Sequence, residues 1–499
     1  MGLPPMKNAL APSDAAPHPQ VAETHTGLVF LVGDRAYKVK KPVVTDFLDF
    51  STLDRREDAC AREVLLNSRL APNSYLGIAH FAAPGEPPEP VIVMRRHPDE
   101  RRLATLVRRG EPVEEHLQAV ALLLSRFHAS AARGREVDAQ ARVEAITGRW
   151  QENLSELERY ADGMVPGLDP EMVDETRRLA IDFIAGRSVL FARRIGERRI
   201  VDGHADLLAD DIFCLDDGPE LLDCLEFDDT LRYVDTIDDA AFLAMDLEYL
   251  GHPELGARFM ATYARLADDD APASLRDFYI AYRAVVRAKV DCVRHAQGVP
   301  GAAADARHHL EIARDHLRAG AVRLILVGGG PGTGKTTVAR ALAESLDALS
   351  ISTDDVRAEM VGRGELAGSP GVLDEGLYTS QNVDAVYEGV LRRAHLSLGG
   401  GRTVVLDGTW GDPRHRERAR QLSQTAAARM LEFVCAAPLD AAVARIRTRT
   451  ETSSQVTPEI ATALAEHEAD VWPGAHRLDT TRPPADTLAE AQDICRLSI

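Results

Sequence analysis

Residues 322–342 read VRLILVGGGPGTGKTTVARAL, and this stretch decides the fold of the C-terminal part of the chain. Val322–Val327 form a near-continuous apolar run, which is typical of a strand buried in a parallel sheet. A glycine-rich segment follows at Gly329–Thr336, and Thr337–Leu342 have a helical pattern. The pattern Gly-x-x-x-x-Gly-Lys-Thr between a strand and a helix predicts a phosphate-binding loop. We therefore expect residues 321–499 to form an α/β domain with a parallel sheet.

The residue types in this loop predict nucleotide binding. Glycines allow backbone N–H groups to wrap around phosphates, and the N-terminus of the following helix favours negative charge. We expect Lys335 to reach the β- and γ-phosphates and the hydroxyl of Thr336 to coordinate Mg²⁺, so the expected cofactors are ATP and Mg²⁺. The residues expected to bind the nucleotide here are Gly329, Gly330, Pro331, Gly332, Thr333, Gly334, Lys335, Thr336 and Thr337.

Three further segments of the C-terminal part carry candidate residues. The apolar run Thr403–Asp407 predicts a second buried strand whose final carboxylate binds Mg²⁺, although turn preference alone also places Asp there. Asp354, three residues before Arg357, lies where a strand meets a helix and is expected to contact an acceptor hydroxyl or to cap the helix. Arg445 and Arg449 share one helical face, from which they would clamp a transferring phosphoryl group or face solvent.

A second group of polar residues surrounds a predicted β-hairpin nearer the N-terminus. His204 and Asp206 precede it with the spacing His-x-Asp, and Asp211 stands directly before its first strand. Two apolar runs around a four-residue Asp/Gly/Pro turn predict the hairpin, with residue 212 roughly opposite residue 223. Asp211 and Asp223 would then meet at its open end, close to Asp206. Three converging carboxylates repel one another unless cations neutralise them, and Mg²⁺ prefers such oxygen ligands.

This arrangement indicates phosphoryl transfer. Asp206 would orient or deprotonate an attacking hydroxyl, while Asp211 and Asp223 would hold Mg²⁺ at the ATP phosphates. Such a site also needs a cation on the phosphates and an anion that holds this cation. Lys38, in Ala-x-Lys spacing on a predicted strand, and Glu63, on a predicted helix, match these two needs.

Lysine is rare in this chain. Of the 58 basic residues only six are lysine, and four of these six lie at positions 38, 40, 41 and 335, in the two segments expected to contact phosphates. Lys40 remains an alternative to Lys38, because side chains two residues apart share one face of a strand. The concentration of lysines favours sites that need a compact ammonium group over coding bias alone.

Composition excludes several classes of protein. The 499 residues are 45% hydrophobic and 27% charged, which is typical of a folded globular chain, and the net charge of -20 argues against wholesale nucleic-acid or membrane binding. The six cysteines show no metal-binding spacing and predict reduced thiols. The N-terminus lacks the apolar core of a signal peptide, and no apolar run approaches the ~18 residues that span a bilayer. We therefore expect a cytoplasmic protein.

Composition and residue patterns divide the chain into three parts. Residues 1–20 are rich in Pro and Ala and predict a disordered tail. Residues 21–318 begin with strand patterns, which include a hairpin at Gly33, and are mainly helical beyond residue 112. Residues 321–499 show the alternating strand and helix patterns of the α/β domain. The sequence does not indicate an oligomeric state.

Residues 21–318 resemble the aminoglycoside phosphotransferase branch of the protein-kinase-like fold. The catalytic loop of that branch reads His-Gly-Asp-Leu-His-x-x-Asn, and a metal-binding Asp follows on the next hairpin. The matching positions are His204, Asp206, Leu207 and Asp223. The departing positions are Ala205 for Gly, Leu208 for His and Asp211 for Asn. The resemblance implies a two-lobe α+β fold, with a small lobe at about 21–100 and a large lobe at about 101–318, and ATP-dependent phosphorylation of a small-molecule hydroxyl.

Residues 321–499 resemble the small P-loop kinases that include gluconate kinases, the polynucleotide kinase phosphotransfer domain and zeta toxins. The segments that carry this likeness are the phosphate loop, Asp354 with Arg357, Asp407-Gly408-Thr409 and the basic stretch Arg445–Arg449. Beyond residue 20 the whole chain resembles bacterial fusions of a phosphotransferase-like domain with such a P-loop domain. The sequence thus predicts a bifunctional ATP-dependent phosphotransferase that acts on small-molecule hydroxyls.

Two alternatives stay open at this point. One domain would bind nucleotide without chemistry and regulate the other or a partner, an alternative supported by Asp211 and by the single glycine in the segment Thr24–Gly27. The P-loop domain would instead phosphorylate a polynucleotide 5′-hydroxyl or, like a toxin, a sugar nucleotide.

Overall fold

The computed structural model describes residues 20–23, 27–44, 49–82, 84–85, 87–369, 375–448 and 472–497. Residues 1–19 of the expected tail, residues 24–26 of the segment with the single glycine, and Arg449 therefore lie outside the described residues. The chain divides into two compact units. The first comprises Met1–Arg177, Ala192–Ala271 and Arg276–His316, and the second comprises Arg178–Phe191, Pro272–Leu275 and Leu317–Ile499. No sequence pattern predicted that two short segments of the N-terminal part group with the second unit.

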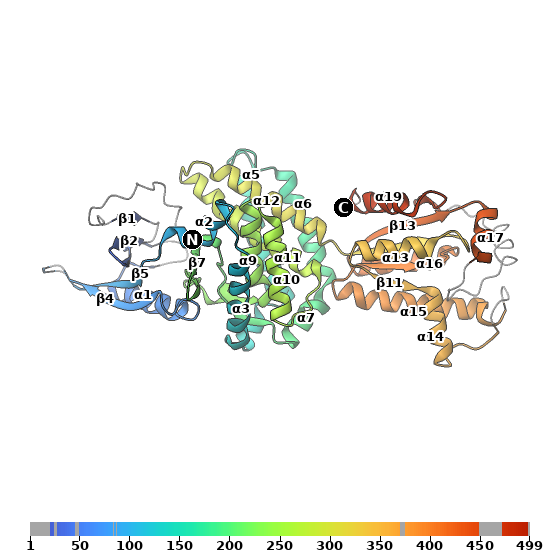
Figure 1. Ribbon diagram of the computed structural model, residues 1–499, viewed down its shortest axis with the longest axis horizontal. Coiled ribbons are helices and arrows are strands. Elements are labelled where there is room, and N and C mark those ends of the chain that lie inside the picture. The colour runs from blue at the N-terminus through green and yellow to red at the C-terminus, as the bar shows by residue number, and fades with distance from the viewer. Residues whose placement is uncertain are drawn as a thin grey trace. The chain divides into compact units, whose positions relative to one another are not determined.

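The first unit begins with an antiparallel sheet in the order β1-β2-β3-β5-β4 (Figure 1). Its strands are β1 (Gln20–Glu23), β2 (Gly27–Val32), β3 (Arg35–Lys40), β4 (Tyr75–Phe81) and β5 (Glu89–Arg95). The expected β2–β3 hairpin is present, and Gly33 in its turn has φ +58°, a conformation that favours glycine. Ala36, Lys38 and Lys40 share one face of β3, and Ala36 is buried in the core beneath it. Both lysines are therefore directed toward the interior of the small lobe.

Helix α1 (Leu53–Asn67) packs against β4 and β5. Its N-terminus is capped by the hydroxyl of Thr52, which accepts a hydrogen bond from the backbone N–H of Arg55. Cys60, Glu63 and Asn67 recur at intervals of three and four residues and are all buried. The helix therefore carries a carboxylate, Glu63, on the same face that it buries.

The rest of the first unit is mainly helical. The helices between residues 103 and 319 are α2 (Leu103–Arg108), α3 (Glu114–Ser130), α4 (Arg135–Ala139), α5 (Val143–Ala161), α6 (Pro170–Gly186), α7 (Ser188–Gly196), α8 (Asp229–Arg232), α9 (Thr236–Tyr249), α10 (Pro253–Leu266), α11 (Ala273–Ala296) and α12 (Ala302–Ala319). Parts of α6, α7, α11 and α12 belong to the segments that group with the second unit. Two small antiparallel pairs interrupt them, formed by β6 (Ile200–Asp202) with β9 (Tyr233–Asp235) and by β7 (Ile212–Leu215) with β8 (Gly218–Leu221). Among the helices of the described residues, none is both long and apolar enough to cross a membrane.

The β7–β8 hairpin corrects the expected register. Ile212 pairs with Leu221 and not with residue 223, because the turn contains only Asp216 and Asp217. The backbone N–H of Leu222 then donates to the carbonyl of Asp211 at 2.9 Å, which continues the pairing beyond the strands. Asp223 is the next residue after this pair, so it still follows directly at the open end of the hairpin.

The second unit contains a parallel sheet in the order β11-β12-β10-β13-β14. Its strands are β10 (Arg323–Gly328), β11 (Leu349–Ser352), β12 (Val404–Asp407), β13 (Arg429–Ala436) and β14 (His476–Asp479). Its helices are α13 (Lys335–Ser345), α14 (Thr353–Gly362), α15 (Ser380–Gly399), α16 (Pro413–Thr425), α17 (Leu439–Thr448) and α19 (Pro484–Leu497). The expected fold class, a two-lobe α+β unit followed by an α/β P-loop unit, is confirmed.

Helices cover both faces of this sheet. Ile325, Val405 and Phe433 belong to one core cluster with buried residues of α13 and α19, so these two helices share a face. On the other face, α15 contacts β11 and β12 and packs between α14 and α16 (Figure 1). A strand covered on both faces is apolar along its whole length, which explains the continuous apolar run of β10.

One half-buried histidine of the first unit makes the stability of this unit depend on pH. His316 on α12 lies 2.8 Å from both Asp277 on α11 and Glu248 on α9. Burial works to lower the pKa of His316, but the hydrogen bonds with the two carboxylates outweigh it and raise the pKa from 6.5 to about 9. The stabilisation is therefore complete below about pH 6.5 and is lost as the pH rises through about 9.

We expect His316→Gln to lower the free energy of unfolding by at most about 3 kcal/mol near pH 6 and by little above pH 9.5. Differential scanning calorimetry at pH 6, 7.5 and 9.5 measures this dependence. His308→Gln, an exposed position on the same helix, is the matched control. An equal loss at all three pH values would contradict the assignment.

Candidate functional site

Lys38 stands at the centre of an ion cluster in the first unit. Its Nζ lies 2.8 Å from Oε1 of Glu63 on α1 and 3.2 Å from Oδ1 of Asp223, which follows β8. The sequence predicted the pairing of Lys38 with Glu63 but did not predict the contact with Asp223. A strand, a helix and a hairpin thus bring one cation and two carboxylates together over 185 residues of sequence.

Lys40 occupies the same cluster in a different way. Its Nζ forms an ion pair at 2.5 Å with the other oxygen of Glu63, Oε2, and lies 3.0 Å from Oε1 of Glu226. Its side chain is 3% exposed, whereas that of Lys38 is 15% exposed. Of the two lysines, Lys38 is the one that contacts the candidate metal ligand Asp223.

Lys38, Glu63 and Asp223 each favour their charged form. Burial works to lower the pKa of Lys38, but Asp223 and Glu63 outweigh it and hold this pKa well above its ordinary value. Burial likewise works to raise the pKa of Glu63 and of Asp223, but the lysines outweigh it, and both pKa values are lowered. The ion pairs therefore persist at neutral pH.

Backbone hydrogen bonds to the carboxylate of Asp239 hold the loop that carries His204 and Asp206. The backbone N–H groups of His204 and Ala205 each donate to the carboxylate of Asp239 at 2.7 Å. Ala205 has φ +67°, a left-handed conformation that costs a non-glycine residue about 1 kcal/mol. A Cβ at Gly203 would meet Asp239 Oδ2 at 2.5 Å, so glycine is required there. The backbone shape next to Asp206 thus depends on a residue that sequence reasoning missed.

Further buried groups support Asp239. His128 Nε2 lies 2.9 Å from its Oδ2, and Tyr263 is hydrogen-bonded to the other ring nitrogen of His128. Burial works to raise the pKa of Asp239, but His128 and the donors of the loop outweigh it and lower the pKa. Arg283 on α11 donates to the carbonyl of Ala205 at 3.3 Å. The available signal was the pair of acids in the first turn of α9, directly before the apolar run Ala240–Met245.

His204 bridges the loop and the hairpin. It is fully buried, and its Nε2 lies 3.1 Å from the carbonyl of Leu222, next to Asp223. Its Nδ1 accepts the backbone N–H of Asp206 at 3.3 Å. Burial lowers the pKa of His204, so the ring is neutral near pH 7. This geometry suits a side chain that orients Asp206 and Asp223 rather than one that transfers a proton.

Asp211 interacts electrostatically with Asp206 and Asp223, the other two carboxylates expected to converge here. Burial, together with the charges of Asp223 and Asp206, holds the pKa of Asp211 well above its ordinary value. Its Oδ2 is buried and has no hydrogen-bond partner among the described residues. A buried carboxylate oxygen without a donor fits a divalent cation. Within the described ranges no three His, Cys, Asp or Glu side chains form a metal cage, so Mg²⁺ would take its other ligands from phosphate and water, as it commonly does.

The phosphate loop of the second unit has the backbone shape expected of it. Gly329, Gly332 and Gly334 all have positive φ, and α13 begins directly afterwards at Lys335. A Cβ at Gly329 would meet the carbonyl of Cys435 at 2.5 Å, and one at Gly332 would meet that of Ala442 at 2.4 Å. The glycines are therefore needed both for conformation and for close backbone packing.

Thr336 and Asp407 lie together beside this loop. The Thr336 hydroxyl donates to Oδ2 of Asp407 at 2.7 Å, while Oδ1 of Asp407 is buried and without a hydrogen-bond partner in the described part of the chain. Burial raises the pKa of Asp407, Lys335 opposes this, and the charge of Asp354 adds to it. The residues predicted from three separate segments are thus close enough to interact, and the unpartnered oxygen again fits a cation.

Asp354 does not cap α14. The N-cap is Ser352, whose hydroxyl accepts a hydrogen bond from the backbone N–H of Asp354. The Asp354 carboxylate instead accepts a 2.6 Å hydrogen bond from Arg357, whose guanidinium lies over the ring of Tyr378. The capping alternative is therefore wrong, and a contact with an acceptor hydroxyl remains a prediction.

Arg445 contacts the backbone around the phosphate loop. Its guanidinium donates to the carbonyl of Thr480 at 2.7 Å and to that of Gly332 at 3.4 Å. Thr480 in turn donates through its hydroxyl to the carbonyl of Thr333 at 2.6 Å. Arg445 thus supports the loop from α17, and its expected action on a phosphoryl group remains a prediction, as does that of Arg449.

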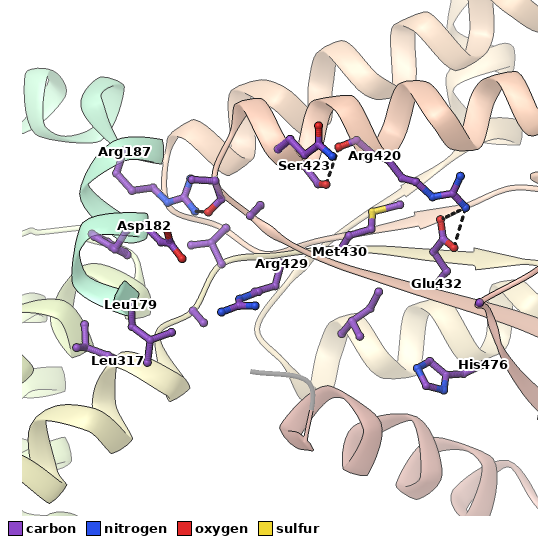
Figure 2. A pocket seen from close by; sticks show the side chains of 18 residues that line it. Leu179, Asp182, Arg187, Leu317, Arg420, Ser423, Arg429, Met430, Glu432 and His476 are labelled. Atoms are coloured by element: carbon purple, nitrogen blue, oxygen red, sulfur yellow. Dashed lines mark hydrogen bonds and ion pairs between the residues drawn. The ribbon is translucent and has the colours of Figure 1, made fainter. Parts of the chain in front are cut away.

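The second unit also contains a cavity of about 700 Å³ (Figure 2). It lies at the edge of the sheet where β13 and β14 begin, whereas the phosphate loop lies at the edge where β10 ends. It is lined by residues that begin β13 and by Arg187, Arg420 and His476, among others. Arg420 forms a 2.9 Å ion pair with Glu432, drawn as a dashed line in Figure 2. None of the predicted site residues lines this cavity.

We expect Asp239→Asn to destabilise the first unit by about 2–4 kcal/mol, because one of two buried N–H donors loses its acceptor and an amide replaces the charge. The thermal midpoint of unfolding measures the loss. Asp217→Asn in the exposed hairpin turn is the control and should leave the midpoint unchanged. A wild-type midpoint for Asp239→Asn would show that this carboxylate does not hold the loop.

Comparison with known proteins gives relatives for the whole chain and for its parts. A model of the AAA domain family matches residues 324–468. The crystal structure of a choline/ethanolamine kinase family protein from Mesorhizobium loti is 14% identical, covers 61% of this chain and 92% of its own, and has a TM-score of 0.39. The crystal structure of a gluconokinase from Sinorhizobium meliloti 1021 is 18% identical, covers 36% of this chain and 93% of its own, and has a TM-score of 0.26.

The Uncharacterized protein Rv2004c of Mycobacterium tuberculosis (strain ATCC 25618 / H37Rv) is 56% identical over 484 residues, which are 97% of this chain and 96% of that protein. The chain belongs to the same family as this mycobacterial protein over almost the full length of both.

Proposed function

We infer that this protein is an ATP-dependent phosphotransferase with a kinase site in each unit. The first site phosphorylates a hydroxyl of a small molecule, and the second is a P-loop kinase site. The observation that carries this proposal is the position of Lys38, 2.8 Å from Glu63 and 3.2 Å from Asp223, because phosphoryl transfer needs a fixed cation beside a metal-binding carboxylate.

In the first site the residues would act in distinct roles. Lys38, held by Glu63, binds the ATP phosphates, and Asp206 accepts the proton of the acceptor hydroxyl as its oxygen bonds to the γ-phosphorus and the bond to ADP breaks. Asp211 and Asp223 would hold Mg²⁺, which neutralises charge on the phosphates when bound. His204 and Asp239 keep the loop and the hairpin in register.

In the second site the backbone would contribute more to phosphate binding than it does in the first site. The N–H groups of the phosphate loop and Lys335 bind the phosphates, and Thr336 with Asp407 would hold Mg²⁺ there. Asp354, whose charge is felt at Asp407, would orient the acceptor hydroxyl. Arg445 keeps the loop in shape through its bonds to Thr480 and Gly332.

Separate inactivation of the two sites tests the proposal. We expect Asp206→Ala and Lys335→Ala each to reduce one ATP-consuming activity by about 10²–10⁴-fold and to leave the other intact. Turnover of ATP is measured with a panel of sugars, amino alcohols and hydroxy acids, with Asp217→Asn as the control for the first site. The proposal fails if no hydroxyl compound stimulates ATP turnover at either site.

Two further arms of the same assay address the alternatives. Tight Mg·ATP binding by the first unit without phosphoryl transfer to any compound would favour a regulatory domain. This alternative is motivated by Asp211, which stands where the resembled catalytic loop has Asn. Labelling of a 5′-hydroxyl oligonucleotide at low salt would instead assign a polynucleotide acceptor to the second site.

A further inference from the structure

Lys40 is a buried cation that the proposed reaction does not use. Its side chain is 3% exposed, and both of its ion-pair partners are carboxylates close to the nucleotide-binding side of the first site, Glu63 and Glu226. We propose that Lys40 is a positioning residue. It fixes Glu63 in the orientation that holds Lys38, and it attaches segment 223–229, which carries the candidate metal ligand Asp223, to the small lobe. This inference rests on the proposed function of the first site.

The two oxygens of the Glu63 carboxylate pair with different lysines. Oε1 faces Lys38 at 2.8 Å and Oε2 faces Lys40 at 2.5 Å, so each oxygen has its own cation. Glu63 is completely buried, and water does not reach it. Without Lys40, one oxygen of a buried charge would lose its counter-ion, and the carboxylate would turn toward the remaining lysine. Lys38 would then lose the fixed direction that phosphate binding needs.

Lys40 also links the small lobe to the segment that carries Asp223. Glu226, three residues later, is held by Lys40 at 3.0 Å, and its backbone carbonyl accepts a 3.1 Å hydrogen bond from Arg62 of α1. Arg62 also forms an ion pair with Asp229. Three cations of the small lobe, Lys38, Lys40 and Arg62, therefore contact one segment of seven residues, 223–229. Two of these contacts do not involve Asp223 itself.

Phosphates bound to Lys38 would compete with Glu63 for its charge. Lys38 then shares its positive charge between phosphate and Glu63, whereas Lys40 keeps both of its carboxylate partners. The position of Glu63 and of segment 223–229 would then depend on Lys40. Its loss should weaken nucleotide binding more than acceptor binding, because both structures that it holds contact the nucleotide side.

The experiment measures nucleotide binding by the full chain in a Lys335→Ala background, which removes the phosphate lysine of the second unit. Isothermal titration calorimetry with Mg²⁺ and a non-hydrolysable ATP analogue gives the Kd. We expect Lys40→Met to weaken binding about tenfold and Lys40→Arg, which keeps the charge, to recover at least half of that loss on a logarithmic scale. Lys289→Met is the matched control, since Lys289 is a lysine of the same unit that pairs with Glu156 outside this cluster.

Glu226→Gln decides the question if Lys40→Met does not fold. Glu226 is partly exposed, and its substitution removes one partner of Lys40 while leaving Glu63 intact. We expect about threefold weaker analogue binding at an unchanged thermal midpoint. Unchanged binding in Glu226→Gln or in a folded Lys40→Met overturns the role of Lys40.

Lys38→Met separates this inference from the proposed function. If Lys38→Met weakens the analogue strongly and Lys40→Met does not, only the inference on Lys40 fails. If Lys38→Met leaves binding unchanged, the proposed nucleotide site of the first unit fails with it. Once an acceptor is known, Lys40→Met should raise the KM for ATP and leave that for the acceptor unchanged, whereas a general loss of folded protein would lower kcat alone.

Discussion

The first unit depends on a charged carboxylate placed where water does not reach it. Asp239 is completely buried, and such a group is tolerated only when donors surround it. The donors are two backbone N–H groups of the loop before Asp206 and the ring of His128. Because the cost of leaving Asp239 unpaired is large, the loop has little freedom to adopt another conformation. The same bonds compensate the left-handed conformation of Ala205.

The two units solve one problem by different means. Each must hold a stretch of backbone in a conformation that ordinary residues avoid. In the second unit, glycines at positions 329, 332 and 334 remove the steric cost, and neighbouring carbonyls leave no room for a side chain. In the first unit an alanine stands in the left-handed position, and buried hydrogen bonds stabilise it. A glycine loop is visible in the sequence as a local motif, whereas a loop held by a distant carboxylate is not.

This difference explains how much could be predicted from the sequence. The phosphate loop was predicted because it is a local motif between a strand and a helix. The pairing of Lys38 with Glu63 was predicted from the Ala-x-Lys spacing and from the need of such a site for an anion beside its cation. Asp239 was missed because its partners lie 34 and 35 residues away and share no pattern with it. The hairpin register was wrong because composition does not reveal that only two of four turn-like residues form the turn. The sequence also did not predict that Glu63 pairs with both Lys38 and Lys40. The alternation of side chains along a strand places both lysines on one face, but it does not show that they share one carboxylate.

Both candidate sites nevertheless share one electrostatic feature. Asp211 in the first unit and Asp407 in the second are buried carboxylates whose pKa is raised, and each has one oxygen without a hydrogen-bond partner among the residues the structure describes. A negative charge at such a position is costly by itself and becomes favourable beside a divalent cation. Binding of a cation there would therefore favour the charged form that burial disfavours. Two unrelated folds thus arrive at the same arrangement, a carboxylate that is made costly by burial and that a cation stabilises.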